Sequence, residues 1–158
     1  MANTQAMTTS FMGQLMTGTH NFGTAPVRAT GATDTFKAAL FLTTATLNAS
    51  TTAYSASNEV SGTGYSAGGV TVTFGTPPTA TNSSTTAGVA FVTPSASITY
   101  TTVTLATAFD AVLIYNSTQA DKAVSVHTFG SQTITAGTFT LTMPTNNTTD
   151  ALIRLATT

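Results

Sequence analysis

The chain contains no cysteine and no tryptophan, and charged residues are scarce. Without cysteine there are no disulfides, thiolate zinc sites, iron–sulfur clusters or cysteine nucleophiles. Charged residues make up 6% of the 158 residues, against about a quarter in an ordinary soluble domain. They stand singly along the chain, so the clustered Lys and Arg that neutralise phosphates are missing, and no nucleic-acid partner is expected.

Long hydrophobic runs are also missing. No stretch reaches 18 consecutive apolar residues, so the sequence predicts no membrane span. The first residues, MANTQ, lack the basic region of a secretory signal. The length fits one domain that buries a core without metals or disulfides.

Threonine is the most conspicuous residue present, at roughly a quarter of the chain. Hydroxyls must therefore replace ions over much of the surface. Free monomers usually stay soluble through interspersed charge, whereas low charge is typical of buried interface cores. We therefore expect a chain that assembles with others; the alternative is simply an unusual surface.

One short amphipathic helix is predicted near the N-terminus, in the segment SFMGQLMTG at 10–18. Ser10 suits the N-cap and Gly18 suits the end of this helix. Its apolar stripe consists of Phe11, Met12, Leu15 and Met16. This stripe either caps the chain's own β core or docks on a neighbouring subunit, because Met packs adaptably. In the second case these four residues are candidate interface residues.

Strands are predicted over most of the remaining chain. Two apolar runs, Thr35–Leu42 and Phe109–Tyr115, have the length and composition of strands buried on both faces. A turn at 116–121 joins the second run to the next strand in a hairpin. Shorter strands are predicted at Gly69–Phe74, Val89–Val92, Ser97–Leu105 with a bulge at Thr101–Thr102, Lys122–Phe129, Thr133–Thr135, Thr138–Met143 and Ala151–Leu155.

These elements predict an all-β fold, an antiparallel β-sandwich of about eight short strands with one short N-terminal helix. Residues 1–34 are predicted to form an N-terminal arm that carries the helix, and residues 35–158 the sandwich domain. The polar segment 79–88 is predicted to be an exposed loop.

A long ordered loop is predicted from Ala45 to Gly69, where turn residues dominate, with at most one edge strand. Loops of this length are uncommon unless they make contacts. We therefore treat this loop as a candidate interface element, with Tyr54 and Tyr65 as its candidate interface residues.

No catalytic, cofactor or metal site is predicted. His20 and His127 are the only histidines, and a hydrolytic triad needs a base oriented by an acid. His127 lies on the opposite strand phase to Val124 and Val126, which predicts that it faces solvent or a partner. His20 follows the helix in a turn, where a local hydrogen bond is expected. Neither histidine has a metal-ligand spacing to the scattered carboxylates.

Five stretches of the chain are informative when taken together: FMGQLMTGTHNFG at 11–23, DTFKAALFL at 34–42, EVSGTGYSAGGVTV at 59–72, FDAVLIYN at 109–116, and the segment 137–156. In combination they resemble small virion structural proteins of tailed bacteriophages. The resemblance spans most of the chain in matching order. It implies a β-rich, non-enzymatic protein located in the virion and assembled in the host cytoplasm.

The function expected first is that of a capsid decoration or cement protein, with the major capsid protein or other virion proteins as partners. A symmetric homo-oligomer, a dimer or trimer, is also expected. The second interpretation is a neck, tail or fibre adaptor, which exposed aromatic residues on loops would favour. The third, from another class, is a small hydrolase or a carbohydrate-binding module, against which the lack of Trp speaks.

Overall fold

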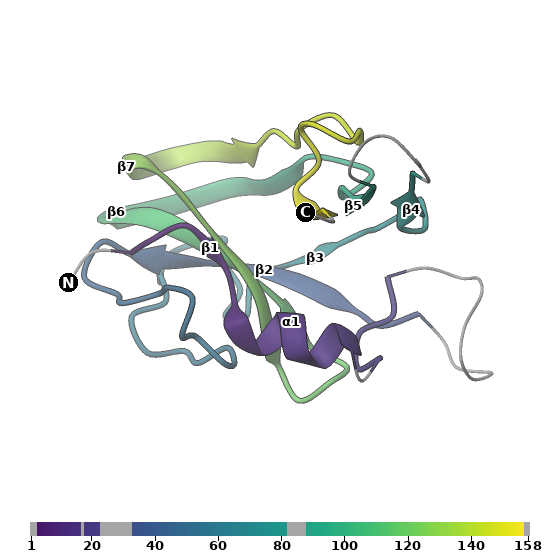
Figure 1. The fold of residues 1–158 in the computed structure, drawn as a ribbon. Coiled ribbons are helices and arrows are strands. Elements are labelled where there is room, and N and C mark those ends of the chain that lie inside the picture. Colours follow the sequence, from purple (N-terminus) through teal and green to yellow (C-terminus); the bar gives the residue numbers. More distant parts are fainter. Residues whose placement is uncertain (1–2, 17, 23–32, 82–87, 157–158) are drawn as a thin grey trace.

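The computed structural model describes residues 3–16, 18–22, 33–81 and 88–156. In these residues one helix and eight strands are found, and the strands form two antiparallel sheets, so the predicted all-β sandwich is confirmed (Figure 1). None of the described helical residues form a segment long and apolar enough to cross a membrane. The elements are β1 (Ala6–Met7), α1 (Thr9–Met16), β2 (Phe36–Leu42), β3 (Val70–Val72), β4 (Thr79–Ala80), β5 (Val89–Val92), β6 (Ile98–Asn116), β7 (Lys122–Leu141) and β8 (Ile153–Ala156).

The hairpin of β6 and β7 is much longer than the predicted strands. The sequence suggested breaks at Gly130 and Gly137, yet the pairing continues past both, and strands of 19 and 20 residues result. Bulges take the place of the breaks, because an extra residue on one strand shifts the register without ending the ladder. The predicted bulge at Thr101–Thr102 is confirmed by a register shift and by a φ of 53° at Thr102.

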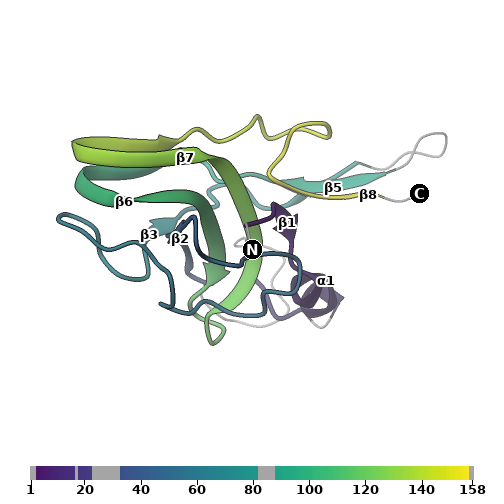
Figure 2. The ribbon, with the colours of Figure 1, turned by 90° about the vertical axis from the view of Figure 1, so that its left-hand side faces the viewer.

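The bulged hairpin also bends back on itself. In Figure 1 the green half of β7 rises away from the 117–121 turn, and the yellow-green half then runs back in a second layer. Figure 2, turned by 90°, shows the same curvature in both strands. Bulges increase local twist and bend a strand, so repeated register shifts are the physical cause of the fold-back. One hairpin thereby supplies strands to both layers.

The larger sheet has the order β1-β7-β6-β2-β3. β2 pairs with β6 from Phe36 opposite Asn116 to Leu42 opposite Phe109, and with β3 on its other side. This central pair is covered on both faces, as the two apolar runs predicted. Phe36 and Leu40 belong to the cluster on one face, while Phe41 belongs to the cluster on the other.

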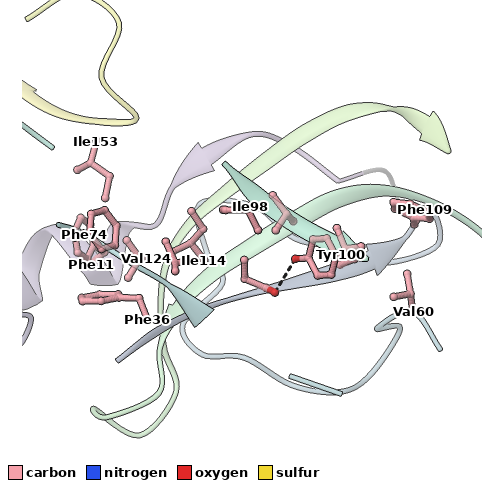
Figure 3. Close-up of a cluster of buried hydrophobic side chains, with 14 of the residues drawn as sticks. Phe11, Phe36, Val60, Phe74, Ile98, Tyr100, Phe109, Ile114, Val124 and Ile153 are labelled. Atoms are coloured by element: carbon pink, nitrogen blue, oxygen red, sulfur yellow. Dashed lines mark hydrogen bonds between the residues drawn. The ribbon is translucent and has the colours of Figure 1, made fainter. Parts of the chain in front are cut away.

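The main core lies between the sheet and the folded-back half of the hairpin (Figure 3). Ile98, Tyr100 and Phe109 enter it from β6, and Tyr100 donates a hydrogen bond of 2.7 Å from its hydroxyl to the carbonyl of Ala38 in β2. Each large side chain buried in this way contributes about 1.5–3 kcal/mol. The Tyr100 side chain therefore extends across the core, and its hydroxyl links the folded-back half of the hairpin to β2.

The helix and the residues that follow it close one end of this core. Phe11 is fully buried, and it contacts Phe22 edge to face at 5.9 Å between ring centroids. α1 packs against β7, so the interpretation in which the helix caps the chain's own core is correct. The described part of the 1–34 arm thus shares its core with the 35–158 sandwich. The N-cap is Thr8 rather than Ser10, because the Thr8 hydroxyl accepts the N–H of Phe11 at 3.3 Å.

The smaller sheet has the order β4-β5-β8. The pairing of β5 with β8, from Val89 opposite Ala156 to Val92 opposite Ile153, brings the end of the chain beside its middle. Residues 79–80, predicted to belong to an exposed loop, form the short exposed strand β4 instead. Residues 82–87 of that predicted loop lie outside the described residues.

The loop that covers the back of the larger sheet runs from 43 to 69 and contains isolated bridges but no strand. Ala45 and Leu47 are buried against the second face of β2 and β6. Gly69 ends the loop with a φ of 73°, and a Cβ at this position would overlap the carbonyl oxygen of Ala38. The close approach of loop and strand backbones therefore depends on the absence of a side chain at Gly69.

Substitution of this glycine tests the close approach. Gly69→Ala is expected to lower the free energy of unfolding by about 3 kcal/mol or more, because the new methyl group meets backbone and the positive φ disfavours it. The control is Gly130→Ala in β7, where a Cβ meets nothing within 4 Å and a change within about 0.5 kcal/mol is expected. Denaturant unfolding measures both variants. Equal stability of the two would contradict the packing described.

Candidate functional site

The four helical residues predicted as an interface stripe lie in different surroundings. Phe11 is buried in the core, and Leu15 is half-buried against it. Met12 points outward with 45% of its surface exposed. The side chain of Met16 lies outside the described residues. Among the described side chains of this stripe, Met12 is therefore the one large apolar residue that is exposed to a partner.

Tyr54 and Tyr65 are half-buried within the chain's own fold. Tyr54 stacks on Tyr115 with ring centroids 4.6 Å apart, and Tyr65 stacks on Tyr100 at 5.8 Å. The predicted loop aromatics therefore attach the 43–69 loop to β6 and do not project from it.

Glu59 joins these two tyrosines. Its Oε2 atom accepts the hydroxyl of Tyr54 at 2.6 Å, and its Oε1 atom accepts the hydroxyl of Tyr65 at 2.7 Å and the N–H of Gly68 at 2.8 Å. Burial and the bond to Glu59 raise the pKa of both phenols well above their usual range. One carboxylate thus holds three donors of the 43–69 loop, which we call the Glu59 cluster.

A second polar cluster is centred on His20, which is only 8% exposed. His20 Nε2 lies 2.7 Å from Gln14 Oε1, and His20 Nδ1 lies 3.0 Å from Asn116 Nδ2. Asn116 Nδ2 also donates to Asp34 Oδ2 at 2.7 Å. Asp34 accepts two further bonds, from the N–H of Asn21 and from Gln119 Nε2. We call this the His20 cluster.

Burial is the main cause of the depressed pKa of His20, which falls to about 4. The Asp34 carboxylate opposes the shift, and Lys122 adds to it. The predicted local hydrogen bond of His20 is found with Gln14, and a second partner, Asn116, is far along the chain. Because the imidazole is surrounded by hydrogen bonds and aromatic rings, it has no open position for a substrate.

His127 lies beside an open cavity of about 300 Å³ between the two sheets. Val124 and Val126 do not share a face as predicted, because a register shift opposite Ile114 and Tyr115 places an extra residue in β7, whereas His127 keeps the predicted phase opposite Val126. The two valines consequently belong to different clusters, and His127 Nε2 lies 2.9 Å from the hydroxyl of the buried Ser125. Burial lowers the pKa of His127 to about 4. The cavity is lined by Gln5–Met7, Ser125–His127 and Ala151–Arg154.

A smaller, apolar cavity of about 60 Å³ lies where α1 and the segment after it meet the smaller sheet. Phe11, Leu15 and Phe22 form one wall, and β5 and β8 form the other. Met12 and Leu155 are the large hydrophobic residues most exposed in the described chain, and Leu155 lines this cavity. Apolar exposure in the described chain is therefore concentrated near the junction of helix and smaller sheet.

Outside these clusters, the titratable side chains of the described residues are dispersed. The described residues contain no group of three His, Asp or Glu side chains that could hold a metal ion. Within the same residues, every buried side-chain nitrogen or oxygen has a hydrogen-bond partner. The two polar clusters are consequently satisfied internally and have the form of structural anchors.

Comparisons with protein-family models, with curated proteins and with solved structures found no match for this chain. Functional inference therefore rests on the residues themselves and on their contacts. Features of the described chain that another molecule can contact include His127, which lines the open cavity between the sheets, and the exposed side chains of Met12 and Leu155.

The anchoring role of the Glu59 cluster predicts a stability loss on neutralisation. Glu59→Gln is expected to cost roughly 1.5–3 kcal/mol of unfolding free energy, because charge-assisted bonds are lost and the amide N–H₂ faces a hydroxyl donor. Asp150→Asn is the control, since its exposed carboxylate accepts from Asn147 in a surface turn. Thermal and denaturant unfolding compare the two. If both variants lose equally little free energy of unfolding, the Glu59 cluster does not anchor the loop.

Proposed function

We propose that this chain is a structural, non-enzymatic subunit of a bacteriophage virion, and that it acts as a capsid decoration or cement protein. Its partners are then the major capsid protein or other virion proteins, together with further copies of itself in a dimer or trimer. Shells held by repeated contacts gain stability from many weak interfaces acting together. The resemblance of segments 11–23, 34–42, 59–72 and 109–116 to small virion proteins supports this setting.

The observation that carries the proposal is the distribution of charge and polarity. Only 6% of the residues are charged, and Glu59 and Asp34 are engaged in hydrogen bonds that hold loops in place. The outer part of the hairpin exposes residues such as Thr133, Thr135 and Thr138 rather than ions. Such a surface has little charge to desolvate when another protein covers it, and this favours a role in assembly.

A neck, tail or fibre adaptor is the alternative within the virion. Exposed loop aromatics were the feature that would favour it. Tyr54 and Tyr65 are instead stacked and hydrogen-bonded inside the fold, which removes that support.

Copy number separates the two virion roles. We expect quantitative mass spectrometry of purified particles to find on the order of hundreds of copies, the number that a lattice role requires because each weak contact must repeat over the shell. Particles that lack the protein should then lose heat and osmotic stability. A dozen or fewer copies would support the adaptor, and complete absence from particles would falsify the virion proposal.

A small hydrolase is the rival from another class, and the Ser125–His127 pair is the observation in its favour. Two facts oppose it. Ser125 is 2% exposed, and burial alone accounts for the depressed pKa of His127, with no contribution from a carboxylate. A hydrolytic base is normally oriented by such an acid.

The hydrolase alternative is tested with p-nitrophenyl acetate. We expect the unmodified protein, Ser125→Ala and His127→Gln to hydrolyse this ester at the same rate. The control variant His20→Gln, which changes the histidine of the His20 cluster, should also show this rate. A rate well above that of the buffer, lost in both Ser125→Ala and His127→Gln but retained in His20→Gln, would establish the pair as a nucleophile and its base.

A further inference from the structure

The orientation of the Asn116 side chain decides the protonation state of His20. Asn116 is fully buried, and its Oδ1 atom accepts the N–H groups of Thr118 and Gln119 at 3.1 and 3.2 Å. Its Nδ2 atom must then face the Asp34 carboxylate, which only accepts hydrogen bonds. A flipped amide would place its oxygen against that carboxylate and would leave two backbone donors unpaired. The amide orientation is therefore determined by three partners.

This orientation leaves His20 one compatible form. Asn116 Nδ2 has two hydrogens, one directed at Asp34 and the other at His20 Nδ1, so Nδ1 must be an acceptor. Nε2 then holds the ring proton and donates it to Gln14 Oε1. An imidazolium would have a donor on both nitrogens and would direct an N–H at the N–H of Asn116. The cluster is built for neutral histidine.

The surroundings of His20 reinforce this preference. Phe11 of α1, Phe22 and Phe36 of β2 surround the ring, with centroids 4.9, 6.2 and 6.3 Å away. The charged groups that act on it are Asp34, which favours the protonated ring, and Lys122, which disfavours it. Burial outweighs Asp34 and lowers the pKa of His20 from 6.5 to about 4.

The segment attached through His20 differs from the segment before it in how it is held. The backbone of residues 3–11 is held by hydrogen bonds in which no histidine takes part. β1 pairs with β7, the N–H of Thr8 donates to the carbonyl of Val124 in the sheet, and the N–H of Thr9 donates to the carbonyl of Ala49 in the 43–69 loop. Residues 14–16 and 18–22 are held by the His20 cluster, in which Asp34 also accepts the N–H of Asn21, and by the packing of Leu15 and Phe22 in the core.

We propose that protonation of His20 releases residues 14–22 from the core while residues 3–11 stay paired with the sheet, so that the chain contains an acid-operated release element. Release would move Leu15 and Phe22 away from the apolar cavity that they line together with β5 and β8.

The direction of the pH effect follows from proton linkage. The released histidine binds a proton near its ordinary pKa of 6.5, whereas the docked histidine does so only near 4. The attachment of the His20 segment to the core is therefore strongest at neutral pH. It weakens as the pH falls below 6.5 and is weakest below pH 4. Between pH 7 and pH 5 the equilibrium constant for release is expected to rise about 20-fold.

Residue-resolved amide hydrogen exchange by NMR tests the proposal, because each segment contains hydrogen-bonded amides. Gly18, Thr19 and Asn21 report on 14–22, while Thr4, Thr8 and Thr9 report on 3–11. After correction for intrinsic exchange, protection of the first set should fall about 20-fold from pH 7 to pH 5, and protection of the second set should hold. Constant protection of the first set, or equal loss in both sets, would overturn the proposal.

Variants separate the two histidines. His20→Gln should abolish the pH dependence of Gly18, Thr19 and Asn21, whereas His127→Gln, which removes the other histidine of depressed pKa, should leave it intact. Persistence of the original dependence in His20→Gln, or its loss in His127→Gln, would rule out control by His20.

Discussion

The burial of the β2–β6 pair on both faces is the constraint on which the rest of the structure depends. Two strands that are apolar on each face are stable only when both faces are covered. The folded-back half of the β6–β7 hairpin and α1 cover one face, together with Val60 and Tyr65 of the 43–69 loop. Ala45, Leu47 and Tyr54 of the same loop cover the other face. Hydroxyls attach the covers to the backbone of β2, because Tyr100 donates to the carbonyl of Ala38 and the Tyr65 oxygen accepts the N–H of Leu40.

Scarce charge gives the few ionic groups an unusual role. Glu59 and Asp34 each accept three hydrogen bonds, and most of the donors are backbone amides or side chains of irregular segments. A carboxylate that accepts several bonds fixes a loop more firmly than a neutral group does. Glu59 and Asp34 therefore serve internal order, while threonine hydroxyls supply part of the exposed polar surface.

The candidate site was only partly predictable. The apolar stripe Phe11, Met12, Leu15 was visible at helical spacing, but spacing gives no sign of which member faces the core, and only Met12 is left exposed. The common face assigned to Val124 and Val126 was wrong because one bulge in β7 shifts the phase of the strand between them. The His20 cluster joins residues nearly a hundred positions apart, and no local pattern in the sequence indicated it.

The sequence by itself determined the all-β class, the two doubly buried strands, the hairpin turn and the bulge at Thr101–Thr102, because hydrophobic period and turn chemistry are local properties. The tertiary structure alone decided that Gly130 and Gly137 interrupt nothing, since pairing with β6 continues past them. It alone decided where the tyrosines and histidines point. Those outcomes depend on partners distant in the chain, which pair only when the hairpin has folded over the sheet.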